Sequence, residues 1–223
     1  VAFDRSVGKL RRKLRELGIA KNTLVWYCSD NGGLGDVKPT SVGELRGFKG
    51  SLYEGGIRVP AIIEWPGLIE PAISQYPAST MDIFPTIADM LDLPDSVILN
   101  PTDGRSIGPL LQGNRPSNDK PIPFRYRNGG ALIDGDFKLF VKDIKLDSFM
   151  LYNLAEDPAE IKDVSLEYPD KFNQLKATFR EYNASIENSI AGLDYPEKQV
   201  TDSSRRHFWM NDQIGRASCR ERV

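Results

Sequence analysis

The sequence has 223 residues, and its 29 lysines and arginines against 31 aspartates and glutamates give a net charge of -2. This nearly balanced charge does not indicate a nucleic-acid partner, and no apolar run approaches the roughly 18 residues of a membrane span. The length allows one large domain, or one and a half ordinary ones, with a real hydrophobic core.

The chain opens with a pattern typical of an amphipathic helix. Apolar residues from Phe3 to Leu17 recur at steps of three and four, and Gly18 suits the end of a helix. The other face is basic, and we interpret it as a solvated helix face, with a patch for a polyanion as the alternative. Its residues are Arg5, Lys9, Arg11, Arg12, Lys13 and Arg15.

The next segment contains the residues of greatest chemical interest. The apolar run at residues 23–28 predicts a strand buried on both faces of a sheet, and it ends at Ser29-Asp30-Asn31-Gly32-Gly33. The carboxylate of Asp30 and the amide of Asn31 therefore lie side by side where open α/β sheets bind their ligands. Their oxygen atoms are the ligands that hard divalent cations prefer. Further along, Lys49 lies in a loop flanked by glycines.

The middle of the chain predicts a strand, a helix and then a long loop. Residues 60–65 predict another buried strand, and Asp82 is a candidate cap for a helix with Ile83 and Ile87 on one face. Residues 94–125 are rich in proline, and we predict a subdomain boundary near their end. The prolines are Pro94, Pro101, Pro109, Pro116, Pro121 and Pro123.

Beyond this loop the pattern changes to a small antiparallel sheet. Residues 130–133 and 137–141, joined by a turn at Asp134-Gly135, predict a hairpin, and residues 149–153 predict a third strand. A helix is expected after Pro169, and its apolar stripe should cover the sheet. The stripe consists of Phe172, Leu175, Phe179, Tyr182, Ile186 and Ile190.

Two motifs resemble the second half of the catalytic core of the formylglycine-dependent (type I) sulfatases, relatives of alkaline phosphatase. They are SDNGG at residues 29–33 and LRGFKGSLYEGGIRVPAIIEWPG from residue 45 onward. Further matches, such as DGRSIGPLLQG and LYNLAEDPAEIKD, extend the resemblance over most of the chain. The resemblance implies an α/β fold, the C-terminal part of an alkaline-phosphatase-like sandwich, with a mixed sheet and flanking helices. A small antiparallel sheet covered by a C-terminal helix is expected to follow.

Three divisions of the chain are predicted. Residues 1–123 should form the C-terminal part of the catalytic domain, and residues 124–200 a small antiparallel subdomain. Residues 201–223 should form a disordered tail. Within this tail, residues 214–223 resemble the translation of a sequencing adapter, and we leave them out of the fold prediction.

The resemblance also implies a sulfuric ester hydrolase that uses one divalent cation, usually Ca²⁺. Asp30 and Asn31 match two metal ligands, and Lys49 matches the catalytic lysine that contacts the sulfate. The family's nucleophile is a formylglycine made within a Cys/Ser-x-Pro-x-Arg motif, which this sequence lacks. We therefore expect the nucleophile in a missing N-terminal part and expect this chain alone to be inactive. Glu54 and Arg58 are expected to hold the loop together, and Arg46 has no assigned role.

Two alternatives remain open at this point. One is a phosphatase, phosphodiesterase or phosphonate hydrolase of the alkaline phosphatase superfamily, and the other is a non-catalytic homologue. The expected substrate is a small-molecule or carbohydrate sulfate ester. The resemblance implies a secreted, periplasmic or lysosomal protein.

Overall fold

The computed structural model describes residues 2–35, 37, 41–94, 96, 98, 102–114, 116 and 120–193. The chain divides into two compact units, Val1–Lys176 and Ala177–Val223, which are considered separately below. The predicted tail at residues 201–223, with the adapter-like residues 214–223, lies outside the described residues. The predicted division after residue 123 stays a prediction.

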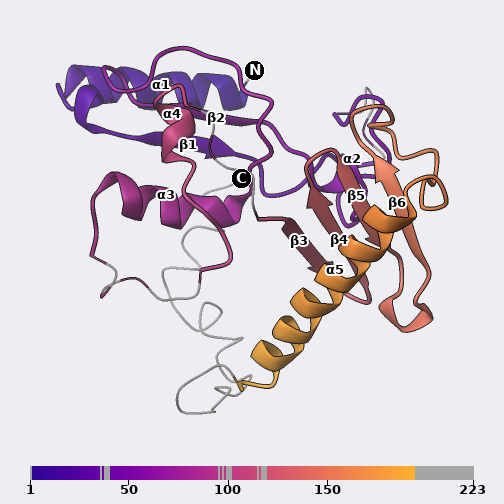
Figure 1. The fold of residues 1–223 in the computed structure, drawn as a ribbon. Coiled ribbons are helices and arrows are strands. Elements are labelled where there is room, and N and C mark those ends of the chain that lie inside the picture. The colour runs from indigo at the N-terminus through magenta and orange to yellow at the C-terminus, as the bar shows by residue number, and fades with distance from the viewer. Residues whose placement is uncertain are drawn as a thin grey trace, which may run out of the picture. The chain divides into compact units, whose positions relative to one another are not determined.

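The chain starts with helix α1 (Ala2–Glu16), as predicted, and Gly18 follows it with a φ of 70°. A short 3₁₀ turn, η1 (Ala20–Asn22), leads to strand β1 (Val25–Cys28), which pairs antiparallel with β2 (Ala61–Glu64). The rings of Phe3 and Tyr27 are 5.2 Å apart, so α1 packs along this two-stranded sheet (Figure 1).

The prediction that both strands are buried is wrong. All four residues of β1 are only half-buried, and β2 begins with two exposed residues, of which Ile62 is 63% exposed. The reason is topological, because each strand has only one neighbouring strand within the described part of the chain. One edge of each strand therefore has no partner strand there.

Short helices follow on both sides of β2. They are α2 (Glu54–Ile57), the 3₁₀ turn η2 (Thr80–Asp82), α3 (Ile83–Met90) and α4 (Gly108–Leu111). Asp82 does precede α3, but its side chain does not cap that helix. The carboxylate instead accepts hydrogen bonds from the amides of Ser79 and Arg105, at 2.8 and 2.9 Å. The predicted capping role is therefore wrong, since Asp82 closes the capping box of the preceding turn.

The second sheet has four antiparallel strands in the order β3-β4-β5-β6. They are β3 (Ile122–Tyr126), β4 (Gly129–Asp134), β5 (Phe137–Val141) and β6 (Phe149–Asn153), with the 3₁₀ turn η4 (Ile144–Leu146) before β6. The predicted hairpin and third strand are confirmed. The turn is displaced by one residue, because Asp134 pairs with Phe137 and leaves Gly135-Asp136 as the loop. Strand β3 was not predicted, and its Pro123 is tolerated because β3 is an edge strand.

The two faces of this sheet have different partners. On one face Ala131, Phe140 and Tyr152 form a buried cluster, against which Leu52 and Tyr53 pack. The opposite face carries Leu132, Leu139 and Leu151, all with no exposed surface. The loop that contains the predicted lysine thus leads directly into a segment that packs on the sheet.

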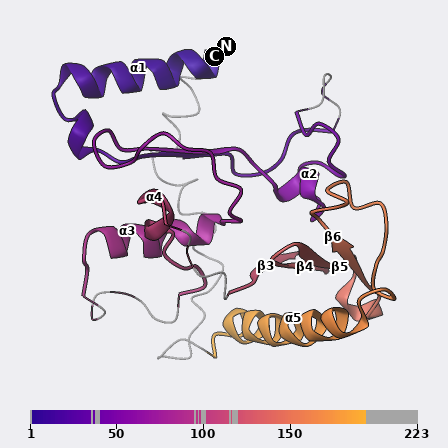
Figure 2. The same ribbon diagram turned by 45° about the horizontal axis from the view of Figure 1, so that its top comes forward.

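Helix α5 (Pro169–Ile190) begins as predicted. Within the first unit it is tied to the sheet by Lys171, whose Nζ lies 2.7 Å from Oδ2 of Asp134 at the end of β4. Leu175 is buried, and Figure 2 shows this first part of α5 beneath the strands. The predicted stripe is not buried to its end, since Ile190 is 65% exposed.

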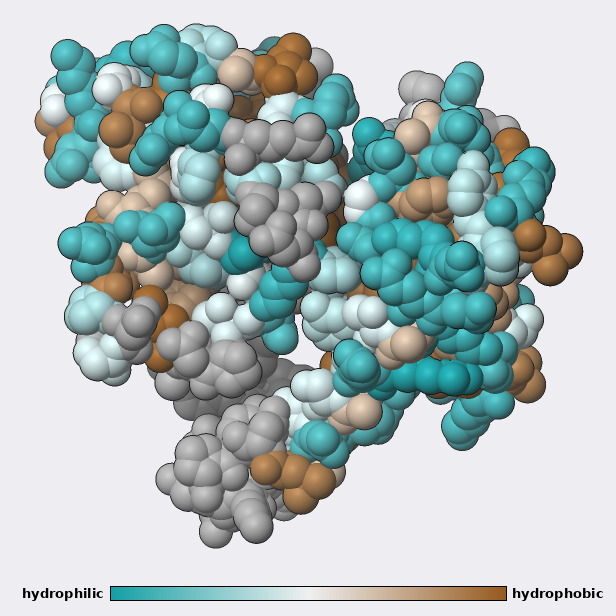
Figure 3. All heavy atoms as spheres, in the orientation of Figure 1, coloured by the Kyte–Doolittle hydropathy of each residue, from teal (hydrophilic) through white to brown (hydrophobic). Residues whose placement is uncertain are grey.

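The face in Figure 3 is mostly hydrophilic, with hydrophobic residues in small groups among the polar ones. No helix in the described part of the chain has the length and apolar character that crossing a bilayer requires.

Candidate functional site

Asp30 and Asn31, the predicted acid and amide, lie in the turn after β1 and differ in their exposure to solvent. Ser29 Oγ donates a hydrogen bond to the carbonyl of Asn31 at 2.9 Å, which folds the chain back at the end of the strand. Asp30 is exposed, whereas Asn31 is half-buried. The Oδ1 atom of Asn31 is buried and has no hydrogen-bond partner among the residues that the structure describes. An acceptor left without a partner is destabilising by itself, so this oxygen is free to take a ligand.

Gly32 locks this turn against α2. Its amide donates a 2.9 Å hydrogen bond to the carbonyl of Gly56. A Cβ atom on Gly32 would lie 1.9 Å from the carbonyl oxygen of Gly55, which is backbone and has no rotamer with which to move away. The turn can approach α2 this closely only because residue 32 is glycine.

The lysine loop lies against the same turn. The amide of Lys49 donates a 2.8 Å hydrogen bond to the carbonyl of Gly33, while the Lys49 side chain is exposed. Gly47 and Gly50 have φ values of 79° and 89°, a region that favours glycine, so they allow the sharp bends on either side of Lys49. The backbone therefore brings together the segments of all three predicted site residues: Asp30, Asn31 and Lys49.

Glu54 is a buried anchor of the loop. Its carboxylate Oε1 lies 2.9 Å from Nζ of Lys138 in β5, and its amide donates a 2.6 Å hydrogen bond to Oε2 of Glu160. Only 4% of Glu54 is exposed. The prediction that Glu54 holds the loop is thereby confirmed.

Lys138 joins both carboxylates. Its Nζ also lies 2.8 Å from Oε1 of Glu160, and neither Lys138 nor Glu160 has exposed surface. Burial raises the pKa of Glu160 above its ordinary value, because desolvation outweighs the opposing effect of Lys138. Sequence reasoning did not identify Lys138. The alternation in β5 could have indicated it, since position 138 shares a face with Phe140.

Arg46, which had no assigned role, supports the same structure. Its guanidinium donates a 2.7 Å hydrogen bond to the carbonyl of Glu160 and lies 4.0 Å from the centre of the Tyr53 ring. The Tyr53 ring in turn stacks on Phe140, with centroids 4.3 Å apart. Arg58 is exposed just after α2, and its backbone amide bonds to the carbonyl of Glu54 at 2.8 Å. This bond does not test the predicted role of its side chain.

The oxygens of Asp30 and Asn31 fit a hard divalent cation in chemical type. The observation that supports this fit is that Oδ1 of Asn31 is buried and finds no partner in the described part of the chain. Within the described residues no three histidine, cysteine or acidic side chains are grouped to hold a metal. Asp30 and Asn31 would thus form only part of a coordination shell.

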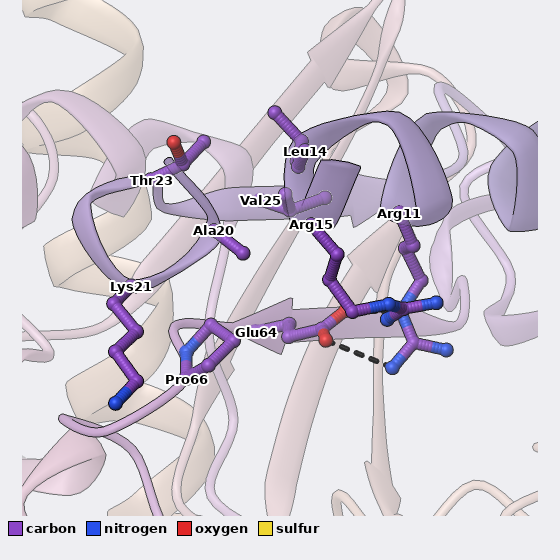
Figure 4. A pocket seen from close by; sticks show the side chains of 9 residues that line it. All are labelled: Arg11, Leu14, Arg15, Ala20, Lys21, Thr23, Val25, Glu64 and Pro66. Atoms are coloured by element: carbon purple, nitrogen blue, oxygen red, sulfur yellow. Dashed lines mark hydrogen bonds and ion pairs between the residues drawn. The ribbon is translucent and has the colours of Figure 1, made fainter. Parts of the chain in front are cut away.

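A separate hollow of about 380 Å³ lies between α1, β1 and β2 (Figure 4). The side chain of Arg11 crosses this hollow, and its Nε lies 2.6 Å from Oε2 of Glu64. The hydrogen bond to Glu64 raises the pKa of Arg11 above its ordinary value. None of the residues that line the hollow belongs to the turn at Asp30 or to the lysine loop. We consider the turn and the lysine loop the better candidate for the functional site. They contain the side-chain oxygens of Asp30 and Asn31, and Oδ1 of Asn31 has no hydrogen-bond partner among the described residues.

Comparisons with known proteins agree on one family. A family model described as Sulfatase matches residues 2–93. The steryl-sulfatase of Mus musculus is 37% identical over 136 residues, which cover 56% of this chain and 21% of that protein. A sulfatase of Formosa agariphila is 32% identical over 237 residues, which cover 89% of this chain and 42% of that protein. The chain thus spans less than half the length of these relatives.

Solved structures show the same fold. A structure from a study of glycosaminoglycan metabolism by Bacteroides thetaiotaomicron superposes with a TM-score of 0.72 at 24% identity. The match covers 82% of this chain and 43% of that one. This likeness confirms the predicted α/β fold class, with small antiparallel sheets and a C-terminal helix.

Proposed function

This chain belongs to the sulfatase family, and from that premise we propose that it forms part of the active site of a sulfuric ester hydrolase. Asp30 and Asn31 supply oxygen ligands for one divalent cation, Ca²⁺, and Lys49 contacts the sulfuryl group of the substrate. The observation that carries this proposal is the buried Oδ1 of Asn31, which has no partner among the described residues and lies in a turn bonded directly to the lysine loop.

The chemistry assigns a distinct task to each group. A sulfate monoester has dispersed negative charge and a poor alkoxide leaving group, so its hydrolysis needs positive charge near the sulfuryl oxygens. Lys49 provides a positive charge whose backbone is fixed by glycine turns, and a pre-oriented charge favours the transition state. When bound, the cation supplies Lewis-acid neutralisation of the substrate charge. Asp30 and Asn31 orient and hold it.

The nucleophile is proposed to come from outside this sequence. The sequence lacks the Cys/Ser-x-Pro-x-Arg motif in which the resemblance predicts a formylglycine. The 223-residue chain alone is therefore expected to supply part of the coordination shell of the cation but not to turn over substrate. We refer below to the chain joined to a segment with this motif as the complete enzyme.

The proposed substrate is a sulfate ester without further specification. The relatives include a steryl-sulfatase, and the structural neighbour comes from work on glycosaminoglycans, so steroid and carbohydrate sulfates are both compatible. A secreted, periplasmic or lysosomal location follows from the resemblance and stays a prediction.

Calorimetric titration of the complete enzyme with Ca²⁺, followed by its assay on an aryl sulfate and an aryl phosphate, tests the proposal. We expect binding of one Ca²⁺ and hydrolysis of the sulfate in preference to the phosphate. Preferred hydrolysis of the phosphate would favour a phosphatase of the same superfamily. If neither ester is hydrolysed although Ca²⁺ binds, the chain would be a non-catalytic homologue.

A further inference from the structure

The buried ion cluster of Glu54, Lys138 and Glu160 joins three distant parts of the first unit. Glu54 opens α2, Lys138 is the second residue of β5, and Glu160 follows β6. Two carboxylates and one ammonium group are thus enclosed with almost no solvent contact. Such a cluster is weak support for stability, because well-packed apolar residues of the same volume often stabilise a fold equally well. A role in specifying position is the alternative explanation.

The contacts around Glu54 define what is positioned. Its amide is held by Glu160 and its carboxylate by Lys138, so the first residue of α2 is fixed at two points. The next two residues of α2 carry the contacts onward. The amide of Gly55 bonds to the carbonyl of Arg46 at 2.7 Å, and the carbonyl of Gly56 accepts the amide of Gly32 at 2.9 Å.

These contacts leave the two loops little freedom. A Cβ on Gly55 would lie 2.4 Å from the carbonyl oxygen of Gly47, so α2 contacts the lysine loop as closely as it contacts the turn after β1. A shift of α2 would therefore move the turn with Asn31 and the loop with Lys49 relative to each other. Their spacing depends on where Lys138 holds Glu54.

Glu160 shows strain consistent with this role. It is a non-glycine residue with a φ of 56°, a conformation that persists only where the surroundings over-determine it. Those surroundings are the amide of Glu54, the ammonium of Lys138 and the guanidinium of Arg46, which binds the Glu160 carbonyl. Arg46 lies in the lysine loop segment, so Glu160 fixes that segment from both of its ends.

We propose that Lys138 is a positioning residue for the active site, which acts through Glu54 and Glu160 to set the spacing between Asn31 and Lys49. The four-stranded sheet is then the platform that orders the two loops. This inference rests on the proposed function, because the spacing matters for catalysis only if both loops meet the substrate.

The test compares Lys138→Met with Leu139→Ala. Leu139 is the next residue of β5, equally buried but on the opposite face, so its truncation destabilises the sheet without removing the ion cluster. The first readout is amide hydrogen exchange of Gly32 and Lys49 in the 223-residue chain, with global unfolding monitored in parallel. The second readout is kcat and KM of the complete enzyme on an aryl sulfate, well below the melting temperature of each variant.

We expect Lys138→Met to accelerate exchange at Gly32 and Lys49 at least tenfold more than Leu139→Ala does, and to lower kcat at least tenfold. Leu139→Ala should keep kcat within about twofold at equal folded fraction. Equal effects of the two substitutions on exchange would overturn the proposal. If exchange responds as expected but the unmodified enzyme does not hydrolyse the sulfate, the proposed function fails while the positioning of the loops stands.

A second variant covers the case in which Lys138→Met does not fold. Glu54→Gln keeps one carboxylate opposite Lys138 and removes only the charge that anchors α2, so we expect it to fold. It should accelerate exchange at Gly32 and lower kcat in the same direction, by a smaller factor. Unchanged exchange and kcat in this variant would also overturn the proposal.

Discussion

The amide of Lys49 donates a 2.8 Å hydrogen bond to the carbonyl of Gly33. This bond joins the loop with the cationic side chain to the turn that follows β1, where Asp30 and Asn31 lie. Because both partners are backbone groups, the contact does not depend on the rotamer of any side chain. It limits how far the base of the Lys49 side chain can lie from the oxygen donors.

The first prediction concerns Asn31. Asn31→Ala removes the buried oxygen that has no partner in the described chain, so Ca²⁺ affinity should fall at least tenfold, about 1.4 kcal/mol. Calorimetric titration of the complete enzyme measures this change, and Asn22→Ala in the exposed turn before β1 is the control. Stability without Ca²⁺ should not decrease, because Oδ1 has no hydrogen-bond partner to lose within the described part of the chain. Unchanged affinity would remove Asn31 from the metal site.

The second prediction concerns the close approach at Gly32. Gly32→Ala would place a methyl group 1.9 Å from the Gly55 carbonyl oxygen, and overpacking of this kind costs about 1–3 kcal/mol or more. Gly8→Ala is the matched control, because open space surrounds Gly8 within α1. There alanine should stabilise the helix by about 0.5–1 kcal/mol. Urea unfolding measures both, and a tolerated Gly32→Ala would contradict the described contact.

Local patterns predicted much of the fold. The steps of three and four between Phe3 and Leu17 gave the first helix, and the Gly135 turn between alternating strands gave the hairpin. Strand β3 was missed because prolines dominate its local signal, while its pairing with β4 is a tertiary effect. Sequence alone also could not show that strand β1 has one neighbour within the described chain.

The site was only partly predictable for a related reason. Asp30, Asn31 and Lys49 are close in sequence, so their motifs are local and could be identified. The partners of Glu54 lie 84 and 106 residues further along the chain, at Lys138 and Glu160. No local pattern pairs residues so far apart, although a lysine on the apolar face of β5 indicates that a buried partner must exist.

The third prediction concerns Lys49. If its ammonium group contacts the sulfuryl oxygens, Lys49→Ala in the complete enzyme should lower kcat about 100- to 1,000-fold, as loss of a pre-oriented charge does elsewhere. Lys142→Ala, exposed at the end of β5, is the control and should leave kcat unchanged. Lys49 is exposed as well, so its removal should leave the melting temperature within a degree or two. Loss of stability without loss of kcat would show that Lys49 acts only in the loop structure.

The fourth prediction concerns the protonation of Glu160. Burial raises its pKa in the folded protein above the ordinary value of 4.5. Between pH 4.5 and the folded pKa, the folded state therefore holds a proton that the unfolded state has released. The free energy of unfolding must then fall as pH rises through this window, and it levels off above the folded pKa.

Glu160→Gln isolates this contribution, because the amide oxygen can still accept the bond from the Glu54 amide but carries no titrating proton. Chemical unfolding of the unmodified chain and of the variant, at intervals from pH 4.5 upward, gives the stability difference between them. The free energy of unfolding of the unmodified chain should fall relative to that of Glu160→Gln as pH rises. Glu156→Gln, at an exposed carboxylate before Glu160, is the control. A difference that stays flat, or shifts toward the unmodified chain, would mean that Lys138 keeps Glu160 ionised throughout.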